Sequence, residues 1–373
     1  MQWRAYPDES NIEEIEKLVK KYFNVYEVHE EEGVIAFFIE LPSDEEMLKQ
    51  RFDFLRNELK EKNMIPILRE KNGEYLIFIT YKPKIKGKSK WINIILFLVT
   101  IITTMLSGAI LFIEENENLM DIFQMEKMLN GLIFFSLPLL SILGIHELGH
   151  YFTSRRYGVA SSLPFFIPIP PNPVLPLGTM GAVISMREPI PDRKALLDIG
   201  VAGPIAGFLV SIPVLIIGLK ISSLIALSEI PKGAPLLGDN LLIIILSNLI
   251  FKIPAGYTLS LHPTAFAGWV GLLVTAINLL PAGQLDGGHV ARAVLKEKHR
   301  YASFATIIFL AGLTFFGMGN WLFLLLLLVF LIGTEHPPPL NEYISLDTKQ
   351  KFLAFIALLI FILSFTPMPI SMK

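Results

Sequence analysis

The chain has 373 residues, of which 52% are hydrophobic, and its mean hydropathy is +0.53. Soluble proteins of this length are less apolar, so the composition predicts a membrane protein. The net charge of −2 gives no basic excess, so nucleic acid is not expected as a partner. Cysteine is absent, which excludes disulfides and thiolate ligands and leaves His, Asp and Glu for any metal site.

The first 84 residues are more charged than the rest and are predicted to form a small soluble α+β domain on the cytosolic side. About 80 residues are enough to fold alone. No catalytic constellation occurs in this part, so a role as a cap or a recognition domain is expected. The pattern of apolar residues predicts helices at Asn11–Phe23 and Asp44–Lys62, two strands within Val25–Leu41 around Glu32-Gly33, and a hairpin over Ile65–Tyr81 turning at Asn72-Gly73.

Residues 91–373 are predicted to form a polytopic α-helical membrane domain with about seven transmembrane helices. A lysine-rich linker, Pro83–Lys90, precedes the first span, and the loop after that span, Glu114–Asn130, is acidic. Positive charge favours the cytosolic side, so the N-terminus is expected there. The predicted spans are Trp91–Ile113, Gly131–Ser154, Ala195–Leu219, Phe266–Leu285, Phe304–Phe316, Trp321–Ile332 and Phe352–Phe365, with a shorter apolar segment at Leu241–Ile253.

Residues 159–191 are apolar but rich in proline, which argues against a helix. Within them, Gly178–Met186 has the pattern of a strand. Irregular backbone at membrane depth is tolerated only where protein or a water-filled cavity covers it. We therefore expect a re-entrant loop or sheet that lies against the second span, near the active site.

The second span contains the sequence His146-Glu147-Leu148-Gly149-His150, an H-E-x-x-H motif. On a helix, positions i and i+4 share a face, so both imidazoles can bind one metal ion. Glu147 lies beside them, where it can take a proton from water. Ionisable residues within a bilayer are costly and usually functional, although a buried polar cluster is the structural alternative.

A zinc enzyme needs a third protein ligand and an open coordination position. Asp286 and His150 both lie near the cytosolic ends of their spans, so we expect them at similar depth, and Asp286 is the candidate. His289 is predicted to have a structural role instead. His336, which precedes three prolines, is predicted to be a loop residue.

Together the two motifs resemble the site-2 protease family of intramembrane zinc metalloproteases, the M50-like peptidases. That family pairs H-E-x-x-H with a downstream N-x-x-P-x-x-x-L-D-G-G, which here runs from Asn278 to Gly288 with nothing missing. Gly203-Pro204-Ile205-Ala206-Gly207 matches the small-residue helix between the motifs, and the resemblance covers roughly residues 131–295, the expected catalytic core. It implies one zinc ion bound by His146, His150 and Asp286, with Glu147 as general base and Asn278 holding the unwound substrate or stabilising its oxyanion.

The resemblance implies that the chain cleaves peptide bonds in or near transmembrane segments of membrane proteins. A metal transporter or a metal-binding membrane scaffold is the alternative. A transporter is expected to repeat ionisable residues along several spans, whereas here they are concentrated in one place. The expected location is the cell membrane of a prokaryote, with the active site toward the cytosol. The sequence predicts neither the substrate nor the oligomeric state.

Overall fold

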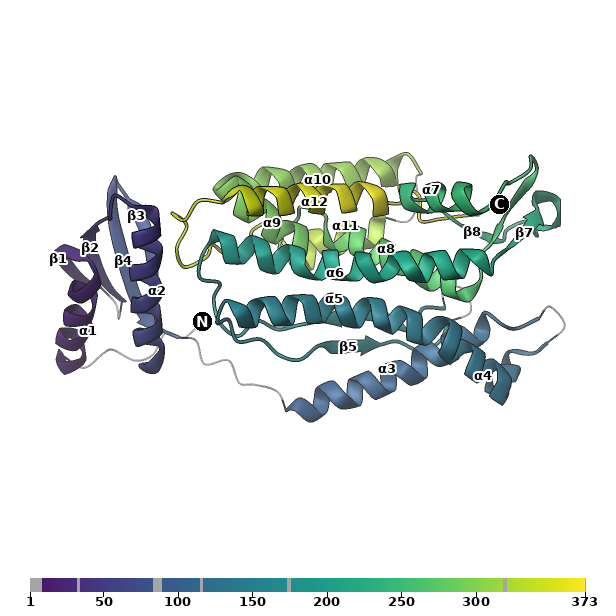
Figure 1. Cartoon of the computed structure of the whole chain (residues 1–373), viewed down its shortest axis with the longest axis horizontal. Coiled ribbons are helices and arrows are strands. Elements are labelled where there is room, and N and C mark those ends of the chain that lie inside the picture. Colours follow the sequence, from purple (N-terminus) through teal and green to yellow (C-terminus); the bar gives the residue numbers. More distant parts are fainter. Residues whose placement is uncertain are drawn as a thin grey trace.

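A computed structural model of the chain describes residues 9–31, 34–82, 89–114, 117–172, 176–317 and 321–372. In Figure 1, a small α+β unit lies at one end of a long bundle of helices, and the C-terminus lies near the other end. Three predicted features fall outside the described residues in whole or in part: the Glu32-Gly33 turn, most of the lysine-rich linker, and part of the proline-rich loop.

The N-terminal unit is a four-stranded antiparallel sheet, in the order β1-β2-β4-β3, that shares one apolar core with two helices. Strand β2 alternates buried and partly exposed residues, the period of two that a half-buried strand requires. Asn72 and Gly73 both have positive φ and form the predicted hairpin turn. The elements follow in the predicted order: α1 (Glu9–Tyr22), β1 (Asn24–Glu31), β2 (Val34–Glu40), α2 (Glu45–Glu61), β3 (Met64–Lys71) and β4 (Glu74–Tyr81).

Three helices of the bundle are long and apolar enough to cross a membrane, so the chain is an integral membrane protein. The second of them is one continuous helix made of α4, a π-helical turn at Leu132–Ser136, and α5. The later apolar helices are shorter, and the count of seven crossings stays a prediction. The three long helices are α3 (Lys90–Ile110), Met125–Arg156, which contains α4 (Met125–Gly131) and α5 (Leu137–Arg156), and α6 (Arg193–Lys220).

The shorter helices complete the bundle. The predicted span Phe266–Leu285 is wrong at its C-terminal end, because α8 ends at Asn278. Pro281 explains this end: a proline ring clashes with the carbonyl four residues earlier and lacks the N–H that continues a helix. The remaining helices are α7 (Leu241–Ile250), α8 (Pro263–Asn278), α9 (Asp286–Leu295), α10 (His299–Phe315), α11 (Leu322–Leu327) and α12 (Thr348–Ser364).

The proline-rich region contains the expected sheet, an antiparallel pair of β5 and β6. Figure 1 shows β5 between α3 and α5, and β6 also contacts α5. Three short two-stranded sheets occur in the described part of the bundle: β5 (Phe165–Pro168) with β6 (Thr179–Val183), β7 (Ser223–Ala226) with β9 (Tyr257–Ser260), and β8 (Pro235–Leu237) with β10 (Ile370–Met372).

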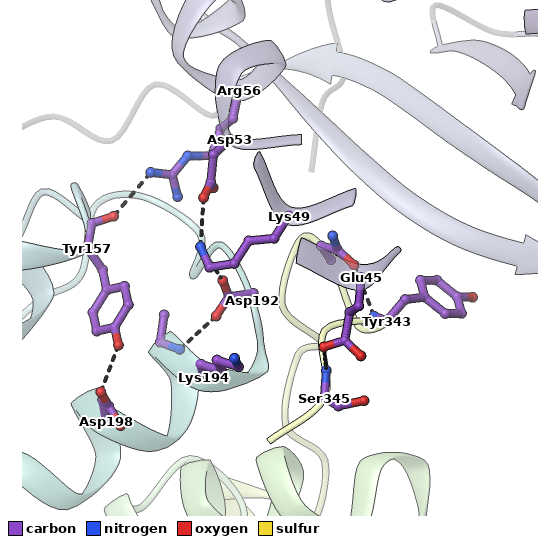
Figure 2. Close-up of polar contacts among 12 residues, drawn as sticks. Glu45, Lys49, Asp53, Arg56, Tyr157, Asp192, Lys194, Asp198, Tyr343 and Ser345 are labelled. Carbon is purple, nitrogen blue, oxygen red and sulfur yellow. Dashed lines mark hydrogen bonds and ion pairs between the residues drawn. The ribbon is translucent and has the colours of Figure 1, made fainter. Parts of the chain in front are cut away.

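The N-terminal unit rests on the end of the bundle and on residues 333–347, which we call the connector. Leu340 and Ile344 of the connector are buried in the same core as the sheet and helices of the N-terminal unit. Figure 2 shows Lys49 and Arg56 of α2 pointing toward Asp192 and Tyr157 of the bundle. The unit is thus held by both apolar packing and polar contacts.

Glu188 is the main anionic partner in this interface. Its carboxylate lies 3.0 Å from Lys60 Nζ and 2.5 Å from Lys82 Nζ, and it accepts a hydrogen bond from the Ala160 backbone N–H. Burial alone raises the pKa of Glu188, but hydrogen bonds from Lys82, Lys60 and Ala160 outweigh it and lower the pKa to about 2.

Because this pKa lies below the ordinary value of 4.5, Glu188 stabilises the fold above about pH 4.5 and loses this effect as the pH falls toward 2. We expect Glu188→Gln to destabilise the full chain by about 1–3 kcal/mol at pH 7. Melting temperatures of wild type and variant, measured from pH 7 to pH 2.5, should converge. The exposed Glu335→Gln is the control, and a difference that does not change with pH would contradict the assignment.

Candidate metal centre

Helix α5 carries three of the predicted site residues on its buried side. His146, Glu147 and His150 are 4%, 5% and 5% exposed. The Nε2 atoms of the two histidines lie 3.2 Å apart. A Glu147 carboxylate oxygen lies 4.0 Å from His146 Nε2. The helical spacing of four residues therefore brings both imidazoles to one point, as the motif predicts.

Asp286, the first residue of α9, completes this group. Its Oδ2 lies 3.2 Å from the Nε2 atom of each histidine. Asn278, the last residue of α8, places its amide nitrogen 3.4 Å from His146 Nε2. The structure therefore brings all five predicted site residues together, from three different helices. Within the described residues, no other group of three His, Asp or Glu residues offers ligand atoms this close.

The donor set fits a zinc ion. Tetrahedral zinc with bonds of about 2.0–2.2 Å places its ligand atoms roughly 3.3–3.5 Å apart, and the three ligand atoms here are separated by 3.2 Å. His150 Nδ1 donates a hydrogen bond to the Ile199 carbonyl oxygen at 2.7 Å, which leaves the lone pair of Nε2 free. Two imidazoles and one carboxylate are a set that zinc enzymes use.

Helix α6 packs closely on the histidines because it presents glycine to them. A Cβ atom at Gly203 would lie 2.1 Å from His150 Nε2, and one at Gly207 would lie 3.2 Å from His146 Nδ1. A Cβ at Gly149 would in turn meet the Ala202 carbonyl oxygen at 2.6 Å. The Gly-Pro-x-x-Gly sequence of α6 thus lets the helix backbone pack directly against both imidazole rings.

Gly287 and Gly288, the two glycines of the downstream motif, both lie in the first turn of α9. A Cβ atom at either position would lie 2.1 Å from a carbonyl oxygen, that of Leu279 or that of Gly283. The two glycines let α9 pack directly on the chain that leaves α8, which keeps Asp286 close to Asn278.

Two backbone groups at the site have no signal in the sequence. One is the Ile199 carbonyl oxygen that orients His150. The other is the Ile184 N–H, directly after β6, which lies beside the Glu147 carboxylate. His336 lies in a loop, as predicted, but it is buried, and its Nε2 lies 2.5 Å from Nδ1 of His289, the residue three positions after Asp286.

Residues 134–319 match the model of Peptidase family M50. The chain belongs to this family. The chain is 32% identical over 242 residues to "Probable zinc metalloprotease EGY1, chloroplastic" of Arabidopsis thaliana. This alignment covers 61% of the chain and 41% of the relative. The chain is 28% identical over 284 residues to "Probable zinc metalloprotease EGY2, chloroplastic" of Oryza sativa subsp. indica. That alignment covers 76% of this chain and 50% of the relative.

A third relative is "DDT domain-containing protein PTM" of Arabidopsis thaliana, which is 36% identical to the chain over 130 residues. This alignment covers 31% of the chain and 7% of the relative. The alignments span half or less of the length of these relatives. No solved structure matches the chain.

The close contact of α6 with His150 leads to a prediction. In Gly203→Ala the new methyl group would overlap the His150 ring, so we expect the ring to move and zinc affinity to fall at least tenfold, the range seen when the support of a ligand is lost. Zinc affinity is measured by chelator competition. Gly312→Ala in α10 is the matched control, because a Cβ there meets no atom within 4 Å. Equal affinities of both variants would contradict the packing argument.

Proposed function

We propose that the chain is a zinc-dependent intramembrane endopeptidase that hydrolyses peptide bonds in or near transmembrane segments of membrane proteins. The observation that carries this proposal is the convergence of His146, His150 and Asp286 in the interior of the bundle, with the Glu147 carboxylate beside them. Membership of a peptidase family and the zinc metalloprotease names of the relatives support it.

The three ligands would hold one zinc ion, which when bound supplies a Lewis acid that activates water and polarises the scissile carbonyl. Glu147 would accept a proton from the attacking water and pass it to the departing amine. The Ile184 N–H beside it gives the buried Glu147 carboxylate a polar neighbour. Burial of the site excludes bulk water, which strengthens each of these electrostatic interactions.

Asn278 would bind the substrate. It is only partly buried, and its amide lies next to His146 Nε2. When that nitrogen binds a metal ion it has no lone pair left for Asn278, so the amide can donate to the substrate backbone or to the oxyanion that forms at the scissile carbonyl. Removal of one such donor typically costs about 10²–10³-fold in rate.

We propose that β6 binds the substrate as an added strand. A helical substrate buries its carbonyls in hydrogen bonds, so it must become extended before cleavage. Within the described part of the chain β6 pairs only with β5, which leaves its other edge open for a peptide. Met180 and Val183 of β6 are 60% and 51% exposed, and Ile184 immediately after it contacts Glu147. A peptide on this edge would lie beside the general base.

We also propose how the chain is divided into domains and how it crosses the membrane. Residues 1–84 would be a cytosolic domain and residues 91–373 a protease domain with about seven crossings and its core at 131–295. Arg155, Arg156 and the basic run 296–300 would lie on the cytosolic side with the active site. The matched relatives are named as chloroplast proteins, so a prokaryotic cell membrane stays a prediction.

A metal transporter or a metal-binding scaffold is the second candidate. Both would use the ligands, but neither needs a base. Within the described residues the structure offers one group of metal ligands rather than a series across the bundle, which favours the protease.

Substitution of Glu147 separates these functions. We expect Glu147→Gln to lower cleavage of a transmembrane substrate by roughly 10²–10⁴-fold, because the general base is lost, and to leave zinc bound. Cleavage is followed in proteoliposomes and zinc content by elemental analysis. His146→Ala should lose zinc and cleavage together, and the exposed Glu297→Gln should lose neither. Cleavage by Glu147→Gln at the wild-type rate would refute the mechanism.

The strand proposal is tested at Met180. Met180→Pro removes one backbone N–H of β6 and disfavours strand pairing there, whereas Met180→Ala removes only the side chain. We expect cleavage to fall at least tenfold for the proline variant and less than threefold for the alanine variant, as roughly one or two lost hydrogen bonds imply. Zinc content checks that the site is intact. Equal cleavage by both variants would argue against strand addition.

A further inference from the structure

The connector, residues 333–347, is bound on both of its sides. Toward the N-terminal unit, the Leu340 carbonyl oxygen accepts hydrogen bonds from Leu68 N at 2.9 Å and from Arg69 Nη1 at 3.1 Å. Toward the bundle, Leu340 N and Asn341 N donate to the carbonyl oxygens of Ile190 and Pro191, each at 2.9 Å. The connector thus lies between β3 and the chain that enters α6, like a strand between two others.

Side chains strengthen the attachment to the N-terminal unit. Ile344 is fully buried in its core, and the rings of Tyr343 and Tyr75 meet edge to face with centroids 5.2 Å apart. Glu45 of α2 accepts a hydrogen bond from Ser345 N at 2.5 Å, as Figure 2 shows. The connector moves with the N-terminal unit, because separating them would expose part of that core to water.

The connector also holds α9. His336 Nδ1 donates to the Pro337 carbonyl oxygen at 2.7 Å, so its Nε2 accepts a hydrogen bond from His289 Nδ1 at 2.5 Å. Six residues further along the connector, Glu342 forms an ion pair with the buried Arg292. His289 and Arg292 both belong to α9, the helix whose first residue is Asp286.

The N-terminal unit holds the histidine helix as well. Arg56 donates to the Tyr157 carbonyl oxygen and Lys60 Nζ to the Gly158 carbonyl oxygen, each at 3.1 Å. These two residues directly follow α5, which carries His146 and His150. The same unit therefore contacts the end of one ligand-bearing helix directly and the other through the connector.

We propose that His336 and Glu342 are positioning residues for the metal site, and that the docked N-terminal unit sets the position of Asp286 relative to His146 and His150. This inference rests on the proposed function. Such sites must be held within about 0.5 Å of the productive geometry, and a ten-residue helix such as α9 cannot do this alone. Release of the unit loosens Asp286 and weakens metal binding, so a partner that binds the N-terminal unit controls cleavage through the metal site.

The first experiment uses the full chain with substitutions in the connector. Glu342→Gln removes the charge that faces Arg292, His336→Ala removes the acceptor for His289, and His336→Gln supplies an amide oxygen in its place. Zinc affinity is measured by chelator competition, and the visible spectrum of the cobalt-substituted protein reports ligand geometry. We expect about tenfold weaker zinc binding and an altered spectrum for the first two variants, with recovery in His336→Gln.

Glu335→Gln, an exposed change in the same segment, is the control and should resemble wild type. Wild-type zinc affinity and cobalt spectra in Glu342→Gln and His336→Ala would overturn the positioning role alone, provided that wild type binds zinc and depends on Glu147 for cleavage. A wild-type chain that binds no zinc would overturn the proposed function and this inference together.

The second experiment loosens docking without a change in the connector. Lys60→Glu with Lys82→Glu places two like charges against Glu188, and the further change Glu188→Lys restores attraction. We expect zinc affinity to fall severalfold in the double variant and to recover in the triple variant. Because the chain has no cysteine, spin labels at introduced cysteines, Lys17→Cys and Arg300→Cys, can report docking by their separation. Unchanged zinc affinity in a double variant whose labels have moved apart would overturn the coupling.

Discussion

The mutual approach of His146, His150 and Asp286, each pair of ligand atoms 3.2 Å apart, is the constraint on which the rest of the bundle depends. Polar groups buried in an apolar interior cost free energy unless they find partners. Here each is partnered, and the surrounding helices are shaped to permit it. Gly203 and Gly207 let α6 lie against the rings, and Gly287 and Gly288 bring α9 onto the end of α8. The small residues of these motifs thus provide the close helix packing that the ligands require. Without them the helices could not approach closely enough for one ion to reach all three.

The sequence predicts the histidine pair well because the spacing of His146 and His150 places both on one helix face, and the structure confirms it. Asp286 was expected at the end of a span. It instead begins α9, after a non-helical segment that follows α8, and it still reaches both histidines. Asn278 was predicted beside them, and it lies next to His146. Backbone partners could not be predicted in this way. The Ile199 carbonyl oxygen and the Ile184 N–H act through their positions, and no residue type marks such groups.

The elements of the N-terminal unit were also predictable, because their periodicities are regular and their turn has a strong signal at Asn72-Gly73. The sequence did not predict which residues outside this unit complete its core. Leu340 and Ile344 lie in an irregular segment, where no repeat of apolar residues distinguishes a buried side chain from an exposed one. His336, next to three prolines, lies in a loop as expected, but for the same reason its burial against His289 could not be predicted. Contacts between residues so far apart in sequence depend on how the whole chain folds.

The burial of Leu340 in the N-terminal core has a consequence for how the protein is made. Arg69 and Leu340 are 271 positions apart, so a ribosome that adds about 5–20 residues per second finishes the N-terminal sheet tens of seconds before it makes the segment that completes its core. During that interval α3, α5 and α6 can enter the membrane while the first unit still lacks its last apolar contacts. The interface between the N-terminal unit and the bundle is completed only after Asp286 and the connector have both been synthesised. Translation order alone thus delays completion of the contacts that hold the metal site until the connector has been made.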